Sequence, residues 1–94
     1  MTEKFIKNFN MLSEYIELNG GNCDWKSIQL NLVNLIKDAE SLISTLAKED
    51  DLYDKVQQVY LELTAINDML TAKKYNIHER LSDIKHFIAT YFYE

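Results

Sequence analysis

The amino-acid sequence predicts an all-α protein that folds as a compact antiparallel four-helix bundle, in a single domain spanning residues 1–94. Apolar residues recur in steps of three and four through most of the chain, which is the period of one helix face. Proline is absent, and the only two glycines are adjacent, at Gly20 and Gly21. No strand pattern competes with these helical repeats, so the apolar stripes are expected to bury against one another.

The first two helices flank the glycine pair. We expect the first over about 3–18, because glycine just past a helix supplies a left-handed cap. The second is expected over about 24–48, with Asn22 or Asp24 as its capping residue. The core-facing stripes are Phe5, Phe9, Leu12 and Ile16 in the first helix, and Trp25, Ile28, Leu32, Leu35, Ala39, Leu42 and Leu46 in the second.

Two further helices follow an acidic interruption at residues 49–51. Carboxylates suit a helix start, where the amide dipoles are positive, so the third helix is expected over about 51–73. Asn76 and Glu79 have capping-box spacing, which predicts a fresh start and a fourth helix over about 77–92. The stripes are Leu52, Val56, Val59, Leu63, Ile66 and Leu70, then Ile77, Leu81, Ile84, Ile88 and Tyr91.

An alternative for the second half of the chain stays open. Leu63, Leu70, Ile77, Ile84 and Tyr91 lie seven residues apart across the expected break, and neither glycine nor proline occurs after residue 21. One long helix could therefore replace the last two. Such a molecule would have three helices and would form a coiled-coil dimer.

Charge restricts the partners. The net charge is −5, and residues 49–68 hold six acids against one lysine. Nucleic-acid binding needs clustered lysine and arginine, so we expect no direct nucleic-acid contact and a protein partner with a basic surface. No apolar run approaches the ~20 residues of a membrane span, and the single cysteine, Cys23, permits no internal disulfide. These features favour a cytoplasmic protein.

We find no catalytic constellation and expect neither an enzyme nor a bound cofactor or metal. The spacing of Arg80 and His86 resembles the arginine-x4–6-histidine signature of the HEPN ribonucleases, which would imply RNA cleavage. That family usually places a polar residue after the arginine, and here Leu81 follows. Six residues on a helix also put the two side chains on different faces. Asp83 and His86 have the i, i+3 spacing of the metal ligands in di-iron carboxylate bundles, but the sequence has no second motif of this kind.

Two surface features are candidate partner contacts. Leu30 and Val33 point away from the main stripe of their helix, and apolar residues outside the stripe need either the bundle or a partner to cover them. The C-terminal aromatics, Phe87, Tyr91, Phe92 and Tyr93, either close one end of the bundle or contribute to an interface. Residues 49–68, which we call the acidic segment, would steer the protein toward a basic partner. The candidate partner-binding residues are Leu30, Val33, Asp50, Asp51, Asp54, Tyr91, Phe92 and Tyr93.

The function expected from these features is a non-catalytic, acidic protein-binding module. We expect a small inhibitor of another protein, such as a phage anti-defence factor of the anti-CRISPR type, which would cover a basic surface like a nuclease groove. Residues 56–63 resemble a helix of the enterocin A type of bacteriocin immunity protein, itself a four-helix antiparallel bundle. That resemblance implies an immunity protein as an alternative. A self-associating structural protein, for example a homodimer, is the third hypothesis.

Overall fold

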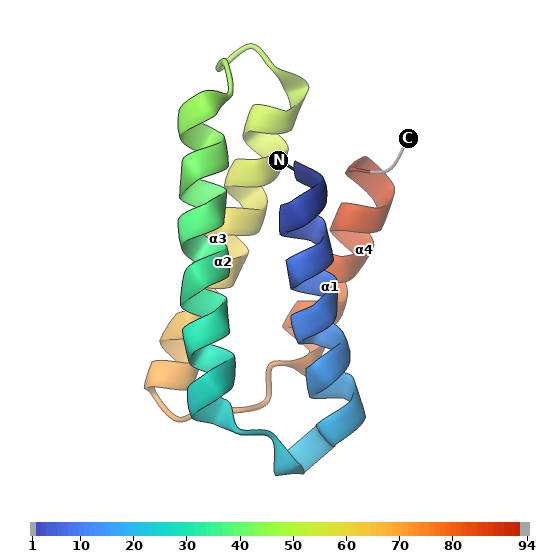
Figure 1. The fold of residues 1–94 in the computed structure, drawn as a ribbon, viewed down its shortest axis with the longest axis vertical. Coiled ribbons are helices and arrows are strands. Elements are labelled where there is room, and N and C mark those ends of the chain that lie inside the picture. Colours follow the sequence, from blue (N-terminus) through green and yellow to red (C-terminus); the bar gives the residue numbers. More distant parts are fainter. Residues whose placement is uncertain (1, 93–94) are drawn as a thin grey trace.

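Four helices run alternately up and down in the computed structural model, which describes residues 2–92 (Figure 1). The helices are α1 (Thr2–Asn19), α2 (Trp25–Thr45), α3 (Asp51–Thr71) and α4 (His78–Tyr91), with a short 3-10 turn η1 (Gly20–Asn22) after α1. The expected four-helix bundle is therefore confirmed. The structure contains no strand between residues 2 and 92.

Each helix packs against the two that flank it in the bundle. The pair α2 and α3 packs most extensively, and α1 contacts α2 and α4 while α4 also contacts α3. The radius of gyration is 13.0 Å, close to the roughly 13 Å of a compact chain of about 100 residues. The helices therefore cover one another within a single chain.

The apolar stripes form the core. Most of the expected stripe residues are buried, whereas Trp25, Leu46 and Leu52 are only partly buried and Tyr91 is 46% exposed. The expectation for Tyr91 as a core residue is thus wrong: it lies in the last turn of α4, where its ring contacts Phe87 and Lys55 at the surface of the bundle. The buried apolar residues are Phe5, Ile6, Phe9, Leu12, Ile16, Ile28, Leu32, Leu35, Ile36, Ala39, Leu42, Val56, Val59, Leu63, Ile66, Leu70, Ile77, Leu81, Ile84 and Ile88.

The first turn between helices forms as the glycine pair predicts. Gly20 has φ +53°, the left-handed conformation that ends α1. The Cys23 thiol lies 3.1 Å from the Gly20 carbonyl oxygen, to which it donates, so the cysteine satisfies a carbonyl of the η1 turn. Asp24 is the N-cap of α2, and its carboxylate accepts hydrogen bonds from the Ser27 amide and hydroxyl.

The break between α3 and α4 rules out the single long helix. Lys73 has φ +59°, the Lys73 amide donates to the Leu70 carbonyl, and the Lys74 amide donates to the Met69 carbonyl. This pair of bonds is a Schellman motif, which ends a helix without glycine when a residue accepts the left-handed conformation. α3 therefore ends at Thr71, two residues before the expected position.

The start of α4 differs from the expected capping box. Ile77 occupies the N-cap position with no side-chain cap, and its side chain is fully buried. Burial of Ile77 in the core fixes the entry of the chain into α4, and Asn76 does not serve as the cap. α2 also ends earlier than expected, at Thr45, whose hydroxyl donates to the Leu42 carbonyl.

No helix within residues 2–92 is both long and apolar enough to cross a membrane.

Candidate binding surface at one end of the bundle

Two of the predicted features meet at one end of the molecule. The start of α3 and the end of α4 lie at the same end of the bundle as the start of α1 (Figure 1). The Lys55 ammonium in the second turn of α3 lies 5.5 Å from the centre of the Tyr91 ring, a cation–π contact between the two segments. The acidic segment and the C-terminal aromatics, about 40 residues apart in sequence, therefore belong to one surface.

The carboxylates at the start of α3 have two different roles. Asp50 is the N-cap, and its Oδ1 accepts a hydrogen bond of 2.9 Å from the Leu52 amide. Asp51 and Asp54 lie in the first turn, and their side chains are exposed. Their charges also stabilise the helix through its positive N-terminal dipole. Asp50 is therefore committed to the fold, while Asp51 and Asp54 can also meet a partner.

The aromatic residues at the end of α4 divide between core and surface. Phe87 and Phe92 pack against the core, and the Phe87 ring lies 4.8 Å from Tyr91 and 6.4 Å from Phe92, centre to centre. Tyr91 remains 46% exposed. Tyr93 lies outside the described residues. An exposed tyrosine packed against a neighbouring ring is the type of side chain that anchors protein interfaces.

A hollow of about 750 Å³ lies beside these residues. Leu52 of α3 and Phe92, the C-cap of α4, border it, and α1 supplies the remaining wall. Two carboxylates, Glu3 and Glu14, and one cation, Lys7, lie along that wall. The complete lining is Thr2, Glu3, Ile6, Lys7, Asn10, Met11, Glu14, Leu52 and Phe92. We call the surface formed by Asp50, Asp51, Leu52, Asp54, Tyr91 and Phe92 the acidic–aromatic end.

Leu30 and Val33 do not belong to this surface. They lie in the second and third turns of α2, at the opposite end of that helix from the α2–α3 connection. Leu30 is 66% exposed, and Val33 is half-buried. Gln29, next to Leu30, donates to Asn67 and Thr71 near the end of α3, so α3 covers the Val33 side of α2 and leaves Leu30 in solvent.

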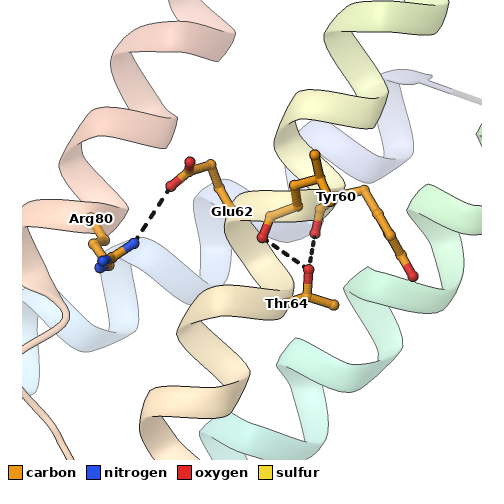
Figure 2. A network of polar contacts seen from close by, with 5 residues as sticks. Tyr60, Glu62, Thr64 and Arg80 are labelled. Carbon is orange, nitrogen blue, oxygen red and sulfur yellow. Dashed lines mark hydrogen bonds and ion pairs between the residues drawn. The ribbon is translucent and has the colours of Figure 1, made fainter.

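The residues considered for catalysis, Arg80, Asp83 and His86, are exposed on the surface of α4. Figure 2 shows Arg80 directed at Glu62 of α3, 3.9 Å away, while Thr64 donates to the Tyr60 and Leu61 carbonyls. Both charged side chains are at least a third exposed, so this ion pair contributes little to stability. His86 and Asp83 are exposed on α4. Within residues 2–92, no group of three or more histidine, cysteine or acidic side chains could hold a metal.

Leu52 and the α1 wall of the hollow are not among the residues that the sequence predicts for a site. Leu52 fits the apolar stripe of α3, but its place in the first turn leaves it only partly covered. Glu3, Lys7, Asn10 and Glu14 recur in steps of three and four along α1. That spacing could have identified a second, polar face on the helix.

Comparisons of the chain with models of protein families, with curated proteins and with solved structures found no significant match.

Proposed function

We propose that the protein is a non-catalytic binding module that docks its acidic–aromatic end onto a basic surface of another protein. The observation that carries this proposal is the juxtaposition of the exposed Tyr91 ring with the carboxylates at the start of α3, joined through Lys55. An exposed aromatic ring beside a group of carboxylates suits an interface that has an apolar centre and a charged rim.

Charge and shape have separate roles in this mechanism. The exposed carboxylates Asp51 and Asp54, in a chain of net charge −5, attract a basic partner and raise the association rate. Tyr91 and the hollow bordered by Leu52 and Phe92 then receive apolar side chains of the partner and slow its release. A module of this kind inhibits by covering the surface, and a nucleic-acid groove is one basic surface that a phage anti-defence inhibitor would cover.

The proposal is tested by cross-linking and affinity capture in cells that express the protein, using matched variants. Asp51→Asn with Asp54→Asn removes two charges at the acidic–aromatic end, and Tyr91→Ala removes the exposed anchor. Asp50 is left intact because it caps α3. Asp68→Asn with Asp83→Asn removes the same charge from exposed positions elsewhere and is the control.

We expect one captured protein with a basic surface, retained by the control variant and lost or strongly weakened with Tyr91→Ala. The Asp51→Asn, Asp54→Asn variant should associate with it several-fold more slowly at low salt and almost normally at high salt. The proposal would be refuted if all variants captured the partner equally, or if the association rate did not change with salt concentration.

A further inference from the structure

A second concave surface lies between α1 and α2, and it shares only Met11 with the lining of the hollow beside the acidic–aromatic end. This groove has a volume of about 610 Å³. Met11 and Tyr15 stand on its α1 side, and they are 60% and 39% exposed. Its lining residues are Asn8, Met11, Leu12, Tyr15, Asp24, Ser27, Ile28, Asn31, Asn34, Leu35 and Asp38.

The groove has an apolar floor and one polar wall. Leu12, Ile28 and Leu35 belong to the core and are almost fully buried, so they form the floor. The polar wall is a single stripe of α2, because its members follow one another in steps of three and four and all are exposed. That stripe consists of Asp24, Ser27, Asn31, Asn34 and Asp38.

The charges of the groove have one sign. Asp24 and Asp38 stand at the two ends of the α2 stripe, about four helical turns or about 21 Å apart. Among the described lining residues there is neither lysine nor arginine. A ligand with a cation near each end would therefore find a carboxylate at each end of the stripe. Asp24 also caps α2, and it keeps its negative charge there because the Ser27 hydrogen bonds hold its pKa below the usual value.

The carboxamides between these carboxylates favour an extended ligand over a helical one. Asn31 and Asn34 on α2 and Asn8 on α1 each present a hydrogen-bond donor and an acceptor. A helix satisfies its own backbone groups, whereas an extended segment brings free N–H and C=O groups that need partners when they leave water. About seven extended residues span the ~21 Å between the carboxylates.

From this combination we propose that the α1–α2 groove binds an extended peptide segment of another protein. The segment carries lysine or arginine near both ends and an apolar side chain in the middle, which packs between Met11 and Tyr15 over the apolar floor. Asn8, Asn31 and Asn34 hydrogen-bond to its backbone.

The test is a selection of random heptapeptides, displayed on a carrier, against the immobilised full-length protein. The selected peptides are then synthesised and their affinities measured for four exposed-site variants. Asn31→Ala with Asn34→Ala removes the carboxamides, and Asp38→Asn removes a charge without touching the Asp24 cap. Asp68→Asn is the matched control on α3, and Tyr91→Ala reports on the acidic–aromatic end. Circular dichroism verifies that each variant keeps its helices.

We expect peptides with a basic residue near each end and an apolar residue between. The double asparagine variant should bind them about tenfold or more weakly, as expected for two lost hydrogen bonds. Asp38→Asn should weaken binding several-fold, while Asp68→Asn and Tyr91→Ala leave it unchanged.

Several results would overturn the inference. They are a selection that enriches nothing, enriched peptides that lack basic ends, binding that the groove variants do not weaken, and groove occupation by a second copy of this chain. Tyr91→Ala should abolish or strongly weaken the proposed docking to a basic protein and leave peptide binding unchanged. Failure of one proposal is therefore distinguishable from failure of the other.

Discussion

At the scale of single residues, three side chains determine the ends of α2 and α3, and only Lys73 departs from the residue types usual at its position. Lys73 takes the left-handed conformation where glycine is usual, and this ends α3. Asp24 and Asp50 accept hydrogen bonds from the first-turn amides of α2 and α3. Acidic residues in this chain are therefore partly structural, and experiments on its charge must separate caps from free carboxylates.

Lys73→Gly should stabilise the protein. A side chain in the left-handed region costs roughly 1 kcal/mol or more, which glycine avoids, although glycine also loses more entropy on folding. We expect a net increase of about 0.5–1 kcal/mol in the free energy of unfolding, measured by urea denaturation. Lys74→Gly is the control, since it removes the same charge from a residue with ordinary φ. Equal effects of both substitutions would contradict the Schellman assignment.

Asp24 should make stability depend on pH in the acid range. The hydrogen bonds from the Ser27 side chain and amide hold the pKa of Asp24 below its usual 3.8. A lowered folded-state pKa stabilises the fold above the unfolded value, and that contribution is lost as pH falls through the folded-state pKa. An asparagine in place of this aspartate would cap the helix without titrating.

The comparison of wild type with Asp24→Asn isolates this contribution. Thermal unfolding midpoints should show wild type losing more stability than Asp24→Asn between neutral pH and about pH 2. Parallel pH profiles for the two proteins would show that the Ser27 bonds do not favour the ionised carboxylate.

At the scale of elements, the sequence predicts the existence of each helix better than its ends. The apolar stripes identify α1 to α4 because their period directly reflects the buried faces. The heptad spacing across residues 72–77 could not exclude one long helix, because burial of Ile77 and the turn at Lys73 depend on tertiary packing. The spacing of Asn76 and Glu79 predicted the break for the wrong local reason.

For the candidate surface, too, the sequence predicted the separate parts but not how they come together. Sequence patterns selected the acidic segment and the aromatic residues separately, but only the up-and-down order of the helices brings Lys55 to Tyr91. Leu30 carried the same signal of exposed apolar surface, yet it lies at the other end of α2. The order and length of the helices determine which exposed residues share a surface. The periodicity of a single helix therefore cannot predict it.

The α3–α4 connection is held against α2 by an aromatic stack. The Trp25 and Tyr75 rings are 4.7 Å apart and inclined by 18°. Tyr75→Ala should lower the free energy of unfolding by about 1 kcal/mol, as for other aromatic pairs. Trp25 is the only tryptophan, so its fluorescence should also change in the folded state. Tyr53→Ala, which removes a tyrosine elsewhere, is the fluorescence control, and an unchanged spectrum with Tyr75→Ala would argue against the stack.

At the scale of the whole molecule, one chain covers its own core. The buried apolar residues come from all four helices and from the residue before α4. The exposed apolar side chains, including Leu30, Leu61 and Tyr91, are spread over different helices. This distribution predicts a monomer whose acidic–aromatic end and α1–α2 groove stay accessible to other proteins.

The sharpest test of a self-sufficient bundle with free binding surfaces is size-exclusion chromatography with light scattering, on the protein alone at micromolar concentration. We expect a monomer with a mass near 11.1 kDa for wild type and for Tyr91→Ala. A stable dimer that Tyr91→Ala converts to monomer would contradict this expectation, because a second copy of the chain would then already occupy the surface assigned to another protein.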